Sequence, residues 1–382
     1  MPKERRVPMR MGITGKDSKI RIGIVFGGRS GEHEVSLTSA ASVIGALDPA
    51  DFEITVIGIK KNGELASASE VCDMLPPQLQ TRVNPYPALE ANVSSFGTMQ
   101  DPLERTENPH RLPEIIFPLL HGPYGEDGTI QGLLEMANLP YIGCGVLASS
   151  VGMDKDVAKR LFLQANLPVP PFRTVLSQEV ERGLGSLKDY LSEEFGYPMF
   201  SKPANLGSSV GIRKIHSEDE FEASVKYSAQ FDRKVLIEKG IDARELECAI
   251  LGNDDAQASV VGEIVPANEF YDYEAKYLSE DSELKIPAQI SNTKAEEIRN
   301  MALQAFKLID GSGLARVDFF LEHGTGKLYV SEINTMPGFT PISMYAKLWA
   351  ASGVSFEQLV RRLAQLGMER YQERKKLRIS NA

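Results

Sequence analysis

The feature that most constrains this chain is a pair of strand-length segments, residues 314–321 and 328–334, on either side of the turn sequence His323-Gly324-Thr325-Gly326. With the period of two of a β-strand, Arg316 and Asp318 share one face of the first segment. By the same count, four residues of the second segment share a face: Leu328, Val330, Glu332 and Asn334. If the strands pair as a hairpin, Asp318, Glu332 and Asn334 converge beside Arg316.

The side chains that converge in this hairpin are hard oxygen donors. Two carboxylates and one amide suit Mg²⁺ bridged to phosphates and would not suit zinc. The alternative is a solvated hairpin face with Arg316 in a surface ion pair, and for any one of these residues alone it would be preferred. The four residues together, followed by Pro337-Gly338 in a loop, favour a metal site.

Length and composition set the class of protein. A chain of 382 residues has room for two or three domains, and its 42% hydrophobic and 25% charged residues are typical of a soluble globular protein. A net charge of −10 argues against a general nucleic-acid binder. The three cysteines are far apart and form no CxxC pair, which favours a reducing compartment. With no apolar run of membrane-spanning length and no signal peptide, we expect a cytoplasmic protein without a membrane partner.

The N-terminal part predicts a small, mostly parallel sheet. Residues 1–19 are basic and aperiodic, and we expect a disordered leader, or a true start at Met11, rather than a targeting segment. Strands are expected at 20–26, 52–59 and 114–120, with helices at 34–47 and 129–138. Glu32 and His33 then lie at the carboxyl end of a strand, where open α/β sheets bind ligands. Residues 62–112 show no firm period and are expected to be mostly irregular.

A weak dinucleotide fingerprint, G-x-G-x-x-A, is formed by Gly143, Gly145 and Ala148. It requires an acidic residue roughly 20 positions further on, and Leu161 to Ala165 contains none. We therefore interpret the glycines as a tight connection between domains and reject a dehydrogenase.

The central part carries a candidate phosphate site. Helices are expected at 154–166 and 186–195 and a strand at 171–175; Lys202 then precedes the Gly-Ser-Ser-x-Gly loop at 207–211. An ammonium followed by backbone N–H groups and hydroxyls is typical of phosphate binding, although a polar hairpin explains the stretch alone equally well. No P-loop sequence occurs, so an ATP site would be of another type. The buried strand that ends at Glu238 could accept a hydrogen bond from adenine or ribose.

The C-terminal part adds strands at 244–251 and 258–265, a helix at 293–310, the hairpin, and a closing helix at 356–367 with a basic tail. Residues 269–277 hold tyrosines and charges without a core-facing period. They could form a surface patch for a partner, and a lid over a ligand is the favoured interpretation.

Five sequence blocks together resemble the ATP-grasp enzymes, and among them the D-alanine–D-alanine ligases. The blocks are GGRSGEHEVSL at 27–37, HGPYGEDGTIQG at 121–132, GMDK at 152–155 with SKPANLGSSVG at 201–211, FYDYEAKYL at 270–278, and ARVDFF at 315–320 with EINTMPGFTPIS at 332–343. They cover the chain from about residue 20 to 370, in the order of the family. Two residues depart mildly from the family pattern. Ser201 stands where a small aliphatic residue is frequent, and Met344 stands where Leu is frequent.

The resemblance implies a role for each matching residue. The ATP-binding residues would be Lys155, Lys202, Ser208, Ser209, Glu238, Lys239, Glu245 and Lys276. The metal ligands would be Asp318, Glu332 and Asn334. The substrate-binding residues would be Glu32, His121, Arg316, Gly338, Ser343 and Met344. The catalytic residues would be Glu32, Ser208, Tyr277, Arg316 and Gly338, with Glu32, Ser208 and Tyr277 in one network.

The resemblance also implies an α/β ATP-grasp fold and a reaction. The expected segments are a leader at 1–19, a substrate-binding domain at 20–147, ATP-grasp subdomains at 148–240 and 241–372, and a tail at 373–382. ATP would convert one D-alanine into an acyl phosphate, which the amine of a second D-alanine attacks, with two Mg²⁺ or Mn²⁺ ions, in a cytoplasmic homodimer that makes a peptidoglycan precursor. The alternatives are a D-alanine–D-lactate or D-alanine–D-serine ligase and a non-catalytic nucleotide-binding protein. The Glu274-Ala275-Lys276-Tyr277 run and the intact metal ligands count against them.

Overall fold

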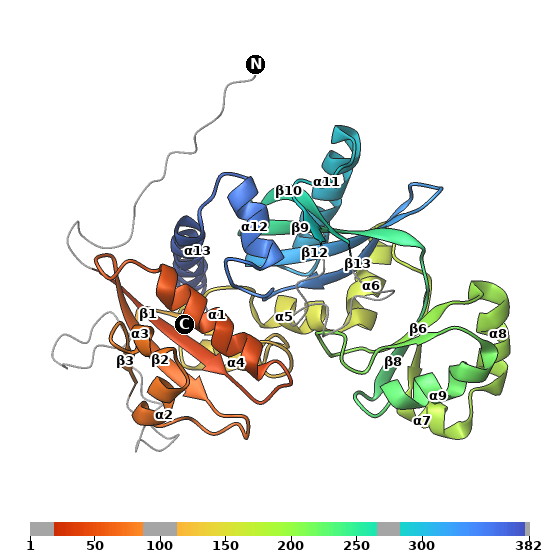
Figure 1. The fold of residues 1–382 in the computed structure, drawn as a ribbon, viewed down its shortest axis with the longest axis horizontal. Coiled ribbons are helices and arrows are strands. Elements are labelled where there is room, and N and C mark those ends of the chain that lie inside the picture. The colour runs from red at the N-terminus through yellow and green to blue at the C-terminus, as the bar shows by residue number, and fades with distance from the viewer. Residues whose placement is uncertain (1–18, 87–112, 266–282, 379–382) are drawn as a thin grey trace.

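The computed structural model describes residues 19–86, 113–265 and 283–378. These residues form three sheets, which lie side by side along the long axis of the molecule (Figure 1). One sheet is parallel and contains the start of the chain, and the other two are antiparallel. No helix in the described ranges is long and apolar enough to span a membrane.

The parallel sheet has the strand order β3-β2-β1-β4. Its strands are β1 (Ile20–Gly27), β2 (Phe52–Ile59), β3 (Asn84–Pro85) and β4 (Ile115–Leu119). Helices α1 (His33–Ala46) and α4 (Thr129–Met136) follow β1 and β4. Both sequence-predicted helices and all three predicted strands are therefore confirmed. Because β1 and β4 are parallel neighbours, their carboxyl ends lie at the same edge, and the loops after them meet there.

The segment after β2 is more regular than its sequence predicts. Helices α2 (Ala68–Asp73) and α3 (Pro77–Gln80) and the short β3 occupy residues expected to be irregular. The expectation is wrong for residues 62–86 because short elements held by caps, such as the Ser67–Glu70 capping box, leave no periodic signal. Residues 87–112 lie outside the described ranges.

Two helices connect the parallel sheet to the rest of the chain: α5 (Val146–Met153) and α6 (Lys155–Gln164). Gly143, before α5, has φ +103° and lies against Gly313, so the predicted tight connection is a close backbone approach. Helix α5 was not predicted, since its apolar and small residues show no helical stripe.

The second sheet has the order β5-β8-β6-β7. Its strands are β5 (Phe172–Leu176), β6 (Met199–Pro203), β7 (Arg213–Ile215) and β8 (Lys234–Lys239). Three helices belong to this region: α7 (Ser177–Arg182), α8 (Gly185–Phe195) and α9 (Glu218–Ser228). Their apolar residues, including Leu191, Phe221 and Val225, form a small separate core with the sheet.

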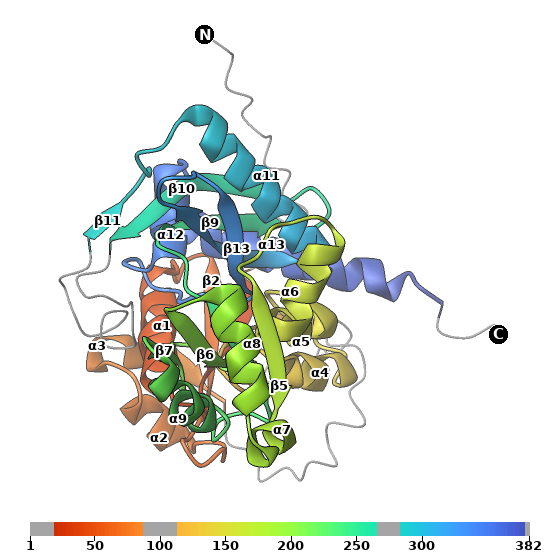
Figure 2. The ribbon, with the colours of Figure 1, turned by 90° about the vertical axis from the view of Figure 1, so that its right-hand side faces the viewer.

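The third sheet has the order β11-β10-β9-β12-β13 and stands above the second in Figure 2. Its strands are β9 (Ala243–Gly252), β10 (Gln257–Val265), β11 (Glu283–Lys285), β12 (Gly313–Glu322) and β13 (Leu328–Asn334). Helix α11 (Asn292–Leu308) packs on it, and α12 (Met344–Ala351) and α13 (Phe356–Lys375) follow. Helix α13 continues beyond the predicted end at residue 367 and includes the start of the predicted tail.

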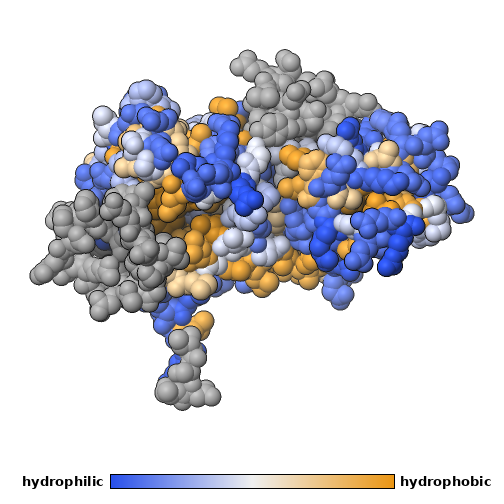
Figure 3. Space-filling view, turned by 90° about the horizontal axis from the view of Figure 1, so that it is seen from below, coloured by the Kyte–Doolittle hydropathy of each residue, from blue (hydrophilic) through white to orange (hydrophobic). Residues whose placement is uncertain are grey.

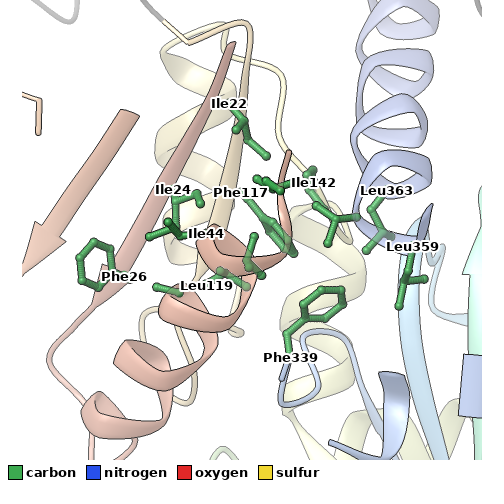
Figure 4. Close-up of a cluster of buried hydrophobic side chains, with 14 of the residues drawn as sticks. Ile22, Ile24, Phe26, Ile44, Phe117, Leu119, Ile142, Phe339, Leu359 and Leu363 are labelled. Carbon is green, nitrogen blue, oxygen red and sulfur yellow. The ribbon is translucent and has the colours of Figure 1, made fainter. Parts of the chain in front are cut away.

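One hydrophobic core joins the parallel sheet to the C-terminal elements (Figure 4). Phe339, from the loop after β13, is fully buried between Phe117 of β4 and Phe356 of α13, at ring-centroid distances of 5.3 Å from each. The loop that carries Gly338 is therefore fixed by core packing. On the surface seen from below, hydrophobic residues gather toward the middle and hydrophilic residues predominate toward the right-hand end (Figure 3).

Candidate active site

The predicted hairpin exists, but one of its faces differs from the expectation. Strand β12 pairs antiparallel with β13, with Asp318 opposite Glu332 and Arg316 opposite Asn334. A bulge then lets Phe319 pair with Val330, so Ser331 is an extra residue. The prediction that Leu328 and Val330 share a face with Glu332 and Asn334 is therefore wrong. Leu328 and Val330 are buried in the core, whereas Glu332 borders a cavity together with Asp318, and Asn334 donates to Asp318.

A cavity of about 90 Å³ lies on this polar face. It is lined by the predicted metal ligands Asp318 and Glu332, the predicted phosphate ligands Lys155, Lys202 and Ser209, and by Ile212, Glu245, Leu246, Glu247, Phe319, Phe320 and Ser331. Residues from α6, the second sheet and its loop at 207–211, and the third sheet thus meet in one small cavity.

Arg316 is held by carboxylates on two strands. Its Nε and Nη2 donate to Asp318 Oδ1 and Oδ2, both at 2.7 Å, and Glu247 Oε2 of β9 is 3.0 Å from Nε. Burial disfavours the charged form, but Asp318 and Glu247 outweigh it and hold the pKa of Arg316 well above its ordinary value. The guanidinium is therefore a fixed cation beside the cavity. The alternative interpretation, a solvated hairpin face with Arg316 in a surface ion pair, is therefore wrong.

The donor set of the hairpin fits a divalent cation. Asp318 and Glu332 face each other across the hairpin, and the amide nitrogen of Asn334 donates to Asp318 Oδ2 at 3.0 Å. The amide oxygen of Asn334 would be the third donor of the set. The described residues contain no group of three or more His, Cys, Asp and Glu side chains that could hold a metal. The predicted ligand set is not a group of that kind, because it has only two carboxylates and its third donor is the amide of Asn334.

A larger cleft of about 1110 Å³ separates the second and third sheets. Strands β6, β7 and β8 supply one wall, with Phe200, Lys202 and Lys239, and β9 to β12 supply the other, with Glu245 and Phe320. The cleft shares Lys202, Glu245 and Phe320 with the small cavity. Its volume is sufficient for a nucleoside whose phosphates would point toward the hairpin.

The lysines at the junction of the cleft and the cavity have defined partners. Lys155, the first residue of α6, donates from Nζ to Leu206 O at 2.6 Å, and Glu332 Oε2 lies 3.8 Å away. Lys202 Nζ donates to Glu238 Oε1 at 2.5 Å. Glu238 is only 1% exposed, so any hydrogen bond from adenine or ribose to its carboxylate would compete with this ion pair.

Glu32 and Ser208 are far apart in sequence and in direct contact in the structure. The Ser208 hydroxyl donates to Glu32 Oε1, and Ser208 and Ser209 have positive φ angles of 49° and 59°. Few non-glycine residues adopt such angles, and they concentrate at ligand-binding loops. On the other side of Glu32, Gly122 has a φ of +73°, which favours glycine, and a Cβ there would lie 2.5 Å from Glu32 Oε2. The loop at 207–211, which we call the flap, and the loops after β1 and β4 thus enclose one carboxylate.

His121 is buried at the same edge of the parallel sheet. Its Nε2 is 3.0 Å from Ser39 Oγ, and its Nδ1 is 3.3 Å from Glu126 Oε1 and 3.2 Å from Met336 O. Burial lowers the pKa of His121, but Glu126 and, more distantly, Glu32 outweigh it, so the pKa is raised. The ring therefore links the parallel sheet to the loop after β13.

That loop ends at the start of α12. Ser343 is the residue before the helix, and its Oγ is 2.8 Å from Thr340 Oγ1. A Cβ at Gly338 would lie 3.3 Å from the same Ser343 Oγ. The N–H of Met344 is the first of the helix, where backbone donors face outward and favour anions. The predicted contacts at Gly338, Ser343 and Met344 thus belong to one short loop.

Tyr277 and Lys276, with the rest of the predicted lid, lie outside the described residues. Two residues that sequence reasoning missed are Lys159 and Glu247. Lys159 is one helical turn after Lys155 on the stripe that also carries Ala158 and Phe162, and a lysine on a buried stripe was a signal that could have been noticed. Nothing in the sequence places Glu247 beside Arg316, because the contact depends on the pairing of β9 with β12.

A nucleotide-sized cleft between two antiparallel sheets, with lysines and paired carboxylates where its phosphates would lie, is the architecture of an ATP-grasp enzyme. The comparisons with known proteins identify the family within this class. Residues 21–144 match the model of the D-ala D-ala ligase N-terminus, and residues 161–365 match that of the D-ala D-ala ligase C-terminus. The chain belongs to the D-alanine–D-alanine ligase family and is an ATP-dependent ligase.

Relatives match over nearly the whole chain. A D-alanine–D-alanine ligase from Heliobacterium modesticaldum is 48% identical over 94% of this chain and 97% of its own length. The structure of the D-alanine–D-alanine ligase from Coxiella burnetii matches with a TM-score of 0.76 at 34% identity, covering 94% of this chain and 96% of its own. The VanG D-Ala:D-Ser ligase from Enterococcus faecalis matches equally well, with a TM-score of 0.76 at 33% identity over 92% of this chain and 100% of its own. The family ligates two D-alanine molecules with ATP for cell-wall precursor synthesis.

Proposed function

We propose that this chain joins two D-alanine molecules through a D-alanyl phosphate, at the meeting point of the parallel sheet, the flap and the hairpin. The contact of Ser208 with Glu32 carries the proposal, because it brings the ATP side of the molecule onto a buried carboxylate of the parallel sheet. A carboxylate that a flap encloses is suited to hold the ammonium group of an amino acid while its carboxylate points toward the phosphates.

In the first step, a carboxylate oxygen of the first D-alanine attacks the γ-phosphorus of ATP, and ADP leaves. Lys155 and Lys202 bind the phosphates, with Ser209 beside them and Lys239 and Glu245 along the nucleoside cleft. Asp318, Glu332 and Asn334 would hold one or two Mg²⁺ or Mn²⁺ ions, which supply charge neutralisation at the phosphates. The main contribution of the chain is to hold several anionic groups in line and to balance their charge.

In the second step, the amine of the second D-alanine attacks the carbonyl carbon, the C–O bond to phosphate breaks, and the amine loses a proton. Arg316, fixed by Asp318 and Glu247, and the N–H of Gly338 are placed to stabilise the negative charge on the carbonyl oxygen. Ser343 and the N–H of Met344 would receive the carboxylate of the second substrate. His121 would lie close to the first D-alanine. The predicted lid, with Tyr277 and Lys276, would exclude water, which otherwise hydrolyses the acyl phosphate.

An oxygen-transfer experiment tests the acyl phosphate. With D-alanine labelled by ¹⁸O in its carboxylate, one labelled oxygen should appear in the released phosphate, because the attacking oxygen leaves with phosphorus. Phosphate without label would contradict the mechanism even if the dipeptide forms.

A product assay tests the second substrate, since one of the similar structures is that of a D-Ala:D-Ser ligase. The protein is incubated with ATP, Mg²⁺, D-alanine and an equal amount of D-serine or D-lactate, and the products are separated by thin-layer chromatography. We expect D-alanyl-D-alanine as the main product. A mainly mixed product would favour the D-serine or D-lactate ligase, and the absence of ligation would contradict the proposal. A homodimer and a cytoplasmic location belong to the same proposal, and gel filtration tests the first.

A further inference from the structure

Lys159 is a fully buried cation in the interior of the ATP-binding region. It belongs to α6, four residues after Lys155, and its side chain is 2% exposed. Two positions four apart in a helix share a face, so Lys155 and Lys159 point the same way. Lys155 reaches the polar cavity, whereas Lys159 is not among the described residues that line either the cavity or the cleft.

The partner of Lys159 is also the partner of a predicted phosphate ligand. Its Nζ is 2.7 Å from Glu238 Oε2, and Lys202 Nζ is 2.5 Å from Glu238 Oε1. One carboxylate thus lies between two ammonium groups, one from α6 and one from β6. Lys202 differs from Lys159 in that it lines both the cavity and the cleft.

The position of the Glu238 carboxylate between two ammonium groups has an electrostatic consequence. A lone Glu238–Lys202 pair would be neutral, and the carboxylate would compete with phosphate for the Lys202 ammonium. The second cation divides the charge of the carboxylate and leaves the group of three with a net charge of +1 beside the polar cavity. The pKa of each partner is lowered, which favours the charged form of Glu238 and disfavours that of Lys159. Burial lowers the pKa of Lys159 more than Glu238 raises it, so the charge assigned to Lys159 rests on its 2.7 Å contact with the carboxylate. Burial alone would raise the pKa of Glu238, but Lys159 and Lys202 outweigh it and hold the pKa below its usual value.

We propose that Lys159 is a positioning residue that occupies Glu238, and thereby leaves the ammonium of Lys202 able to bind the nucleotide phosphates. The inference rests on the proposed function of Lys202 as a phosphate ligand. Lys159 acts through Glu238 and does not touch the nucleotide. A burial role alone would predict that its loss weakens the fold and the binding of every ligand of the cleft to the same extent.

The experiment compares a phosphate-bearing ligand with one that lacks phosphates. Dissociation constants for adenosine and for the non-hydrolysable β,γ-imido analogue of ATP are measured by calorimetry. The Kd for adenosine divided by the Kd for the analogue gives the contribution of the phosphates. The variant is Lys159→Met, which removes the charge but keeps the length of the side chain. Lys202→Met is the positive control, and Arg21→Met, which loses a less buried ion pair in the parallel sheet, is the negative control.

We expect the ratio to fall about tenfold or more in Lys159→Met and in Lys202→Met, as the loss of a charged hydrogen bond predicts, and to stay within about twofold in Arg21→Met. In the double variant Lys159→Met, Glu238→Gln, the competing carboxylate is absent, and the ratio should return to within about threefold of the parent value. If Lys159→Met does not fold, the double variant alone tests the inference, because a direct contact of Lys159 with phosphate would keep its ratio low.

Each of the other outcomes would overturn the role of Lys159, the phosphate role of Lys202, or both. An unchanged ratio in Lys159→Met, with a reduced ratio in Lys202→Met, would overturn the inference and leave the proposed function intact. A ratio that falls in Lys159→Met but does not recover in the double variant would mean that Lys159 acts directly, and would also overturn it. An unchanged ratio in Lys202→Met would remove the phosphate role of Lys202, and the inference with it.

Discussion

Replacing Arg316 with lysine separates the fixed geometry of the guanidinium from its charge. Arg316 makes two N–H···O contacts of 2.7 Å with Asp318 and lies 3.0 Å from Glu247, and a lysine ammonium cannot reproduce the planar two-donor contact with Asp318. Loss of one hydrogen bond to a charged group costs about 1.5–3 kcal/mol, so we expect the free energy of unfolding to fall by about that amount. An equal loss at the developing oxyanion would lower kcat about 10- to 150-fold.

The KM for ATP should change little, because the contact with the carbonyl oxygen strengthens only as charge develops there. A coupled assay of ADP release gives kcat and KM, and urea unfolding gives stability. Arg21→Lys is the matched control, since the Arg21 side chain is 17% exposed against 16% for Arg316 and is paired with Glu114 far from the site. A kcat within threefold of the parent, or a raised KM with unchanged kcat, would refute the reasoning.

A phosphinate mimic of the tetrahedral intermediate gives a second readout. It should inhibit the parent slowly and tightly and the Arg316→Lys variant weakly. Equal inhibition of both would assign the oxyanion contact to another residue, and inhibition of neither would contradict the acyl-phosphate mechanism.

Three further predictions concern other parts of the chain. Glu332→Gln should abolish turnover without unfolding the protein, because the side chain borders the polar cavity outside the core; normal activity with unchanged Mg²⁺ dependence would exclude the metal site. Tyr277→Phe should lower kcat/KM for D-alanine about 2- to 13-fold, the equivalent of one hydrogen bond, and unaltered kinetics and products would contradict the lid role. Arg244 holds the pKa of Glu263 below its ordinary value, so the pair stabilises the fold above the unfolded-state pKa and loses this effect as pH falls through the folded-state pKa. The difference in unfolding free energy between the parent and Glu263→Gln should therefore be constant above about pH 5 and shrink below about pH 4, and a difference independent of pH would argue against the pair.

The sequence predicted the elements whose physical signal is local. Apolar runs with glycine-rich ends marked β1 and β4, and the loops after them were correctly expected at one edge of a parallel sheet. Alternation in the hairpin brought Asp318 together with Glu332. These features depend on neighbours in the chain or on the rule that parallel strands share an edge.

What the sequence could not predict depends on pairing between distant segments. Glu247 reaches Arg316 only because β9 lies beside β12, and Lys159 is paired only because α6 packs near β8. The bulge at Ser331 follows from a balance between core packing of Val330 and the polar site, and no single-strand period contains that information. The domain boundaries and the roles of the site residues stay predictions.

The extra residue at Ser331 also restricts which changes of length this hairpin can accept. Substitutions on the hairpin alter one side chain at a time, but a deletion at position 331 would restore a regular alternation and reverse the faces on one side of it. Either the polar pair would turn into the core, or Leu328 and Val330 would turn out of it. A library of single-residue deletions should therefore show a sharp loss of function at this hairpin.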